Sequence, residues 1–397
     1  MLYEFKIKTL TPLTVAVKEG FKGLLYKALK EHIPGSTVKG SILSKIIREY
    51  GVSKLVNNEV HDPQISITQA LACPSMDYTL IENVLPTHPL CYRWKTEKRI
   101  ETLNLGDLLT EFKKSKDVKR AFSNILDKVT KLHLDYFKTR AILRSTGEMV
   151  SKPFIAVKRN GVWEKITVHT STYIQVGIEK ISRRASPGLI YGYEYVKPGQ
   201  CYTGFIAGKR VENIAKMLGE TSELKIGRGI SRGFGTVLFE LREVDVEKFF
   251  EEKLSKIVDL DCLKKEEPLC LYALSPLVTE PLGEVLNANI KGSLELPTNW
   301  LSKNIGELNA KIKLEVYGAL SFGTELYRGF SLRTTTPKIT VKSLAKGTLL
   351  LCEIKEVSGT SSNLEKLLTY TVFYGLDFFS TQGYNHVIPL TKDPFLT

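Results

Sequence analysis

A glycine-rich basic segment directly precedes an apolar run near the middle of the chain. Residues Lys225–Thr236 contain four glycines, two arginines and one lysine, and the run Val237–Arg242 that follows predicts a strand. Glycine tolerates positive φ and lets another backbone come close, so the segment predicts a tight loop. A dinucleotide-binding fold needs its glycines between a strand and a helix, and a P-loop needs Gly-Lys-Ser/Thr. The order seen here excludes both.

The chemistry of this loop suits a phosphodiester chain. Successive N–H groups in such a loop can form a nest for an anion, and the Arg228 and Arg232 side chains would add forked phosphate donors. The remaining residues that we predict to contact RNA in this loop are Lys225, Ser231, Gly233 and Phe234. The alternative is a flexible basic hairpin that binds nothing.

The charge balance agrees with a polyanionic partner. The chain has 397 residues, enough for two or three domains, and a formal net charge of +13. An excess of this size favours nucleic acid, although a basic surface can also serve solubility alone. No apolar run approaches the roughly 18 residues of a membrane span. Residues 1–7 alternate like a strand, unlike a signal peptide, so we expect a cytoplasmic protein without membrane contact.

The order of predicted elements indicates the fold. A strand over 2–17 precedes a helix that ends at Gly51, in which Val38, Ile42 and Ile46 recur every four residues. After an insertion over about 52–170, with a helical region at 103–137, strands at 173–181 and 189–206, a helix at 211–218 and a last strand follow. This is the βαββαβ order of a ferredoxin-like α+β domain, which we place at 1–243.

A second domain of the same kind is predicted at 268–397, after a helical linker over 244–267. Its first strand repeats the mid-strand proline of the first domain, Leu274-Ser-Pro-Leu against Leu10-Thr-Pro-Leu. Residues 382–385 stand before a terminal strand, where the glycine loop would lie. The pattern predicts tandem ferredoxin-like, RRM-like domains, the second of them degenerate.

Three segments resemble the RAMP superfamily, which builds CRISPR–Cas effector complexes and processes CRISPR RNA. Residues 33–40, Ile-Pro-Gly-Ser-Thr-Val-Lys-Gly, are similar to the signature at the start of the family's first helix. Residues 181–191 resemble an arginine-rich connection of tandem-domain members, and Lys225–Thr236 resembles the family's glycine-rich loop. The insertion is not covered by the resemblance.

The resemblance implies a subunit of a type III effector complex, most like the type III-D tandem-RAMP group that holds the 5′ handle of the guide RNA. It implies guide RNA, other RAMP subunits and the large polymerase-type subunit as partners, with target RNA nearby. It implies no catalysis. Slicing members use an aspartate before the Ile-Pro-Gly-Ser motif, whereas residues 17–32 contain only Glu19 and Glu31. The alternatives are a metal-independent endoribonuclease that processes guide precursors, a target-slicing backbone subunit, and a generic RNA-binding protein.

Further residues complete the predicted RNA-binding set. Gly35, Ser36 and Thr37 begin the first helix, whose free N–H groups and dipole can receive a phosphate, and Lys39 would add charge. Ser36 or Thr37 is also a plausible N-cap. The cluster Lys180, Arg183 and Arg184 predicts a phosphate contact at a strand end, against the alternative of a solvated turn.

Two chemical candidates remain. If the protein is an endoribonuclease, the resemblance implies His32 as its general acid or base. Cys73, His88 and Cys91, with His61 upstream, offer zinc ligands, although no Cys-x2-Cys pair is present. The alternative is buried thiols and a surface histidine, and we expect no other cofactor.

Overall fold

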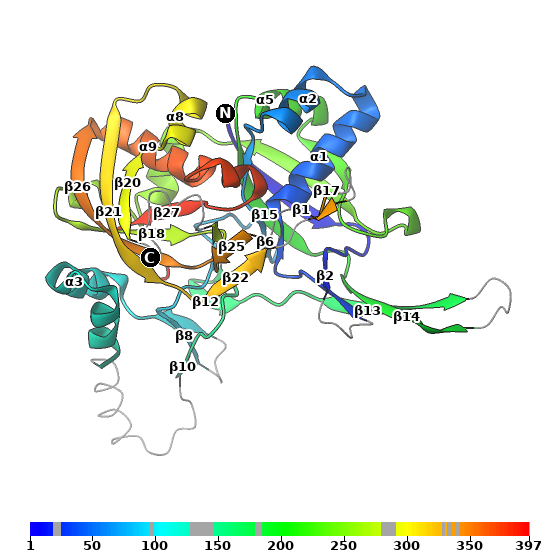
Figure 1. Ribbon diagram of the computed structural model, residues 1–397, viewed down its shortest axis with the longest axis horizontal. Coiled ribbons are helices and arrows are strands. Elements are labelled where there is room, and N and C mark those ends of the chain that lie inside the picture. Colours follow the sequence, from blue (N-terminus) through cyan, green and yellow to red (C-terminus); the bar gives the residue numbers. More distant parts are fainter. Residues whose placement is uncertain are drawn as a thin grey trace, which may run out of the picture.

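The computed structural model describes residues 1–18, 25–94, 99–127, 147–178, 185–278, 291–327, 330–331, 336–337 and 341–396. Figure 1 shows two mixed helix-and-strand units side by side, with the N-terminal unit around α1 and the C-terminal unit around α9. A two-stranded arm and a helical segment project from them. None of the helices among the described residues has the length and apolar character needed to cross a membrane.

The N-terminal unit is built on an antiparallel sheet with the strand order of a ferredoxin-like domain. The order is β16-β17-β1-β15-β6-β4, with β5 paired to β15. Its strands are β1 (Leu2–Thr9), β4 (His32–Ile33), β5 (Ser66–Ile67), β6 (Ala70–Cys73), β15 (Cys201–Ala207), β16 (Thr221–Lys225) and β17 (Thr236–Glu243). Since β1, β6, β15 and β17 come first to fourth in the chain and lie in the order fourth, first, third, second, the predicted fold class is confirmed.

The second strand of this sheet comes from a segment that we had assigned to the insertion. All four residues of β6 are buried, and Cys73 lies opposite Cys201 of β15. We had expected 173–181 in this place. That segment instead belongs to β13 (Thr170–Ile178), where Ile174 is 67% exposed. A short apolar strand such as β6 gives little periodicity, which is why the longer alternating segment was preferred.

β13 forms the projecting arm with β14 (Ala185–Val196), seen at the right of Figure 1. At its base, β14 pairs in parallel with β3 (Leu25–Ala28), which pairs with β2 (Ala16–Lys18). The two-stranded arm is therefore part of a four-stranded sheet, which is separate from the main sheet of the N-terminal domain.

Three helices accompany the N-terminal sheet: α1 (Gly35–Tyr50), α2 (Lys54–His61) and α5 (Val211–Leu218). Val38, Ile42 and Ile46 of α1 are fully buried, as their spacing predicts. The N-cap is Pro34, whose side chain has no polar atom to accept a hydrogen bond, so the predicted cap at Ser36 or Thr37 is wrong. The helix begins two or three residues earlier than either polar cap would place it.

The middle of the chain forms two small sheets and a helical segment. One sheet contains β8 (Cys91–Trp94), β9 (Ile100–Thr102) and β10 (Gly147–Met149), and the other contains β7 (Val84–Pro86), β11 (Ile155–Arg159) and β12 (Val162–Lys165). Helix α3 (Leu105–Ser115) buries Leu108, Leu109 and Phe112. This part of the predicted helical region is confirmed, and 128–146 lie outside the described residues.

The C-terminal domain repeats the topology. After α6 (Val246–Phe249), the π-helical turn η2 (Phe250–Leu254) and the 3-10 turn η3 (Leu260–Cys262), the sheet order is β20-β21-β26-β18-β27. The strands are β18 (Pro268–Ala273), β20 (Gly292–Leu296), β21 (Ala310–Leu320), β26 (Leu349–Gly359) and β27 (Val387–Leu390). The helices and turns are α8 (Asn299–Ile305), α9 (Ser361–Tyr374) and η4 (Phe378–Gln382). Short strands flank them: β19 (Leu277–Val278), β22 (Thr324–Tyr327), β23 (Phe330–Ser331), β24 (Thr336–Pro337) and β25 (Val341–Leu344).

Backbone hydrogen bonds match between the two domains at two corresponding places. The N–H of Gly199 donates to Thr9 in the first domain, and that of Gly347 donates to Ala273 in the second. The last strands agree too, because the N–H of Gly235 donates to Pro12 and that of Asn385 donates to Pro276. The two domains thus share these turn contacts, and the internal duplication stays a prediction.

One apolar core runs through both domains. At their junction, Phe205 of β15, Phe249 of α6 and Phe373 of α9 form an aromatic triad with ring centroids 4.4–5.6 Å apart. All three side chains are buried. The linker thus contributes to the core as well as connecting the domains.

Candidate nucleic-acid interface

The glycine loop joins the edge strand β16 to β17, which pair from Lys225 and Thr236 onward. Gly227, Gly229, Gly233 and Gly235 all have φ between 77° and 85°. A Cβ at Gly235 would meet the carbonyl oxygen of Ile226, and one at Gly227 would meet that of Thr14. Glycine is therefore required at these two positions by both conformation and space.

The backbone of this loop is occupied by the protein itself. Six of its amides donate to backbone carbonyls, those of Ile226, Arg228, Arg232, Gly233, Phe234 and Gly235. These six amides are therefore not available to an anion, because carbonyls of residues 12 and 14 and of the loop itself accept from them. A nest formed by the other amides of the loop stays a prediction.

Four of the residues that were predicted to contact RNA are exposed on this loop, as is Ile230. Arg228, Ser231, Arg232 and Gly233 are exposed on the loop and its 3-10 turn η1 (Ile230–Arg232). Lys225 is half-buried and its ammonium donates to the hydroxyl of Thr236. The Ser41 hydroxyl of α1 donates to the Lys225 carbonyl at 2.7 Å, which fixes the start of the loop. Lys225 thus supports the loop, and the two arginines present its charge.

Aromatic rings from the base of the arm lie beside this charge. The Phe234 ring centroid is 6.2 Å from that of Tyr173 on β13 and 5.8 Å from that of Tyr195 on β14. A pocket of about 60 Å³ is lined by Thr14, Tyr173, Tyr193, Arg228, Gly229, Arg232 and Phe234. Forked guanidinium groups next to aromatic faces can bind a phosphate and stack a base together. We call this pocket the arginine–tyrosine pocket.

Sequence reasoning missed the tyrosines of this pocket. It predicted Phe234 as the aromatic residue of the loop, whereas Tyr173, Tyr193 and Tyr195 supply the rings beside it. Tyr193 and Tyr195 are spaced two apart in a strand, which places them on one face. That alternation is visible in the sequence, but the contact with a loop 40 residues later depends on the tertiary fold.

The start of α1 does not join the pocket. Gly35 is buried, and a Cβ there would lie 2.8 Å from the Thr68 carbonyl oxygen and 2.9 Å from Cα of Gly383. Gly383 follows η4, the second domain's counterpart of the glycine loop. A phosphate at Gly35 would have to displace this contact. Ser36 and Thr37 are half-buried in the same first turn.

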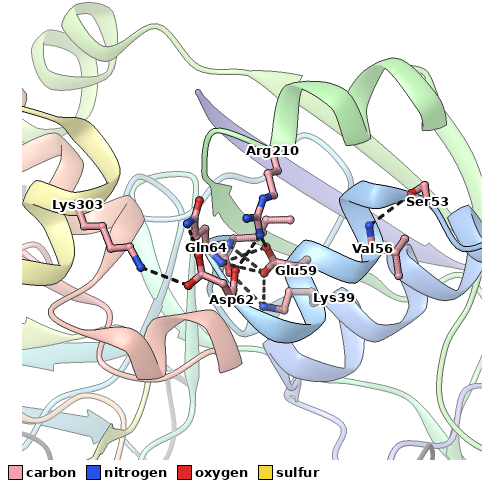
Figure 2. A network of polar contacts seen from close by, with 9 residues as sticks. Lys39, Ser53, Val56, Glu59, Asp62, Gln64, Arg210 and Lys303 are labelled. Carbon is pink, nitrogen blue, oxygen red and sulfur yellow. Dashed lines mark hydrogen bonds and ion pairs between the residues drawn. The ribbon is translucent and has the colours of Figure 1, made fainter.

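Lys39 belongs to a polar network that ties three helices together (Figure 2). Its ammonium lies 2.9 Å from Oε1 of Glu59 in α2, and the Arg210 guanidinium before α5 lies 2.9 Å from Oε2. The Glu59 side chain is fully buried and also accepts from the amides of Gln64 and Ile65. Lys39 therefore has a structural partner at the position where an RNA contact was predicted. Lys180, Arg183 and Arg184 lie outside the described residues.

His32 pairs with a lysine of the other domain. The Lys346 ammonium lies 2.9 Å from Nδ1 of His32. Burial, with the lysine charge as a smaller cause, holds the pKa of His32 well below its usual value, and burial lowers the pKa of Lys346 to about 8. The neutral imidazole uses its Nδ1 lone pair to accept from the lysine, so this nitrogen is not available as a general base.

The zinc candidates are distributed over different contacts. The Cys73 thiol donates to the Ser75 carbonyl, whereas His88 faces Asp393 at 3.5 Å with the thiol of Cys91 nearby. The Cys91 and Asp393 side chains outweigh burial and raise the pKa of His88 to about 10. His61 ends α2 elsewhere. Across the described ranges, no group of three or more His, Cys, Asp or Glu residues is placed to hold a metal ion.

Comparison with known proteins adds a family. A sequence model of the RAMP superfamily matches residues 6–238. Among solved structures, a chain of type III-B Cmr-beta bound to cognate target RNA and AMPPnP is similar at 12% identity and TM-score 0.43, over 88% of this chain and 86% of that chain. Cmr4 from Pyrococcus furiosus is similar at 12% identity and TM-score 0.27, over 62% of this chain and 99% of that chain. None of the curated proteins matches the sequence.

Proposed function

The chain belongs to the RAMP superfamily, and we propose that it is a non-catalytic, guide-RNA-binding and scaffolding subunit of a type III CRISPR effector complex. In this role the arginine–tyrosine pocket holds the repeat-derived handle of the guide RNA. Other RAMP subunits and the large polymerase-type subunit are the neighbours, and target RNA passes nearby. The type III assignment rests on the family and on the sequence resemblance.

One observation carries the proposal: two exposed arginines line a single pocket together with the aromatic side chains of Tyr173, Tyr193 and Phe234. Phosphate contacts supply most of the affinity for a nucleic acid and position the strand. Stacking on an aromatic ring contributes about 1–3 kcal/mol per base and accepts any base. The site therefore suits a single strand that lays a phosphate against the arginines and a base on the neighbouring rings.

The test is the double variant Arg228→Ala/Arg232→Ala in the assembled complex, with guide-RNA affinity measured across a salt series. We expect affinity to fall at least about tenfold, because charge-assisted hydrogen bonds are worth about 1.5–3 kcal/mol each. We also expect the slope of log K against log salt to become shallower by about 1.4, since single strands give about 0.7 per phosphate contact.

The matched control is Lys216→Ala/Arg242→Ala, which removes two exposed cations that pair with Glu212 and Glu240. It should leave the slope within error of the wild type. If both double variants change affinity and slope equally, only the net charge matters, and the pocket is not the binding site.

The endoribonuclease reading makes a different prediction. It requires cleavage of repeat RNA in EDTA and loss of cleavage in His32→Ala. The hydrogen bond from Lys346 to His32 opposes it, since that bond occupies the imidazole lone pair. Cleavage that depends on His32 would replace the non-catalytic role with a nuclease role.

A further inference from the structure

A second pocket, built from residues other than those of the glycine loop, collects lysines from separate segments. It encloses about 250 Å³ between the turn before β7, the β11–β12 hairpin and the linker after η2. Its polar lining consists of Glu82, Asn83, Lys158, Asn160, Lys253 and Lys256. We call it the three-lysine pocket.

The lysines are positioned by neighbouring structure. The Lys158 ammonium lies 5.9 Å from the ring centroid of Trp163, and the Lys253 ammonium lies 5.4 Å from that of Phe249. The backbone N–H of Lys158 donates to the Asn83 carbonyl at 2.9 Å, which joins the hairpin to the turn. An aromatic face attracts an ammonium group without neutralising its charge. These contacts hold the two ammonium groups in place.

The pocket has an excess of positive charge. Three lysines face one carboxylate, Glu82, which is exposed and accepts a hydrogen bond from the Thr79 hydroxyl at 3.3 Å. Neither Lys253 nor Lys256 forms an ion pair with any residue in the described ranges. Like charges gathered in one concavity repel one another and focus an attractive field for anions.

The turn that brings Glu82 and Asn83 to the pocket is held in a costly conformation. Ile81 has φ of 75°, in the left-handed region that β-branched residues avoid, and its N–H donates to the Val84 carbonyl at 3.2 Å. Such residues are kept only where the surrounding structure determines them, and they occur often at ligand sites.

We propose that the three-lysine pocket binds a phosphate group, carried either by a phosphodiester chain or by a free nucleotide. Lysine recognises phosphate as a compact positive charge with three rotating donors, and three of them from separate segments can surround one group. The pocket joins the middle segment of the chain to the interdomain linker, so an occupant would bridge these two parts. The proposal is independent of the arginine–tyrosine pocket because the two share no residue.

The experiment measures binding of tripolyphosphate to the full chain, together with protection of lysines from acetylation read by mass spectrometry. We expect Lys253→Ala/Lys256→Ala to weaken tripolyphosphate binding at least about tenfold. In the wild type, the probe should protect Lys158, Lys253 and Lys256. The control Lys264→Ala/Lys265→Ala removes two exposed lysines of the same linker that do not line the pocket, and it should change binding by less than about twofold.

Protection by single-stranded RNA but not by a nucleoside triphosphate identifies a phosphodiester chain as the source, and the reverse identifies a free nucleotide. Equal weakening in both lysine pairs, or protection spread evenly over surface lysines, overturns the proposal. The variant Arg228→Ala/Arg232→Ala should bind tripolyphosphate at this pocket as the wild type does. A result that overturns phosphate binding at the three-lysine pocket can therefore be told apart from one that overturns guide-RNA binding at the arginine–tyrosine pocket.

Discussion

At the scale of single residues, the glycines of the loop are not equivalent. Gly233 and Gly235 have similar φ, but a Cβ at Gly233 meets nothing within 4 Å, whereas one at Gly235 meets the Ile226 carbonyl. Gly233→Ala should therefore cost only the left-handed conformation, about 1–2 kcal/mol. Gly235→Ala should cost clearly more, because the β16–β17 turn must also shift. Urea unfolding of both variants tests this, and equal losses would contradict it.

The same scale shows what sequence could and could not predict about the site. Arg228, Ser231, Arg232 and Gly233 were predicted for the loop, and the structure exposes them together. The amides expected to form a nest include those of Arg228 and Gly235, which bond to the carbonyls of Thr14 and Pro12, more than 200 residues away in the chain. A pattern within twelve residues contains no information about such partners. Gly35 is a similar case, since its neighbour Gly383 comes from the other domain.

At the scale of elements, the Glu59 network decides how α1, α2 and the start of α5 sit together (Figure 2). Glu59→Gln removes a buried charge that faces Lys39 and Arg210 and accepts from two amides. Breaking one partner of a buried pair costs about 3–5 kcal/mol, so we expect a loss near the lower limit, since both cations are partly exposed. Thermal and urea unfolding measure it.

The control at this scale is Glu49→Gln, which breaks the exposed pair with Lys45 inside α1. It should change stability little, because water screens such pairs. A similar loss in both variants would show that the network contributes no more than a surface ion pair.

Element prediction succeeded where a pattern was long and failed where it was short. The buried stripe of α1 and the helix α5 follow from their apolar spacing. β6 has only four residues, all buried, so no alternation identified it as the second core strand. The arm was predicted as strands but assigned to the wrong sheet, because strand propensity does not specify a partner.

At the scale of the whole molecule, we expect the aromatic triad to couple the unfolding of the two domains. Phe373→Ala should cost about 3–5 kcal/mol, since it leaves a cavity between Phe205 and Phe249. We expect a single unfolding transition that moves as a whole when followed by calorimetry. Phe378→Ala, at a side chain that is 45% exposed, is the matched control and should have little effect. Two separate transitions, only one of them shifted, would mean that the domains unfold independently.

The contact between Gly383 and Gly35 makes the loops of the two domains unequal. The two domains have loops at corresponding places, and the second loop packs against the first domain's helix α1, backbone against backbone. The second loop contains no arginine, whereas the first exposes Arg228 and Arg232. A partner that binds this loop finds one copy of it in each chain, on the N-terminal domain. The two domains share a topology, but the molecule presents its basic loop on the N-terminal domain alone.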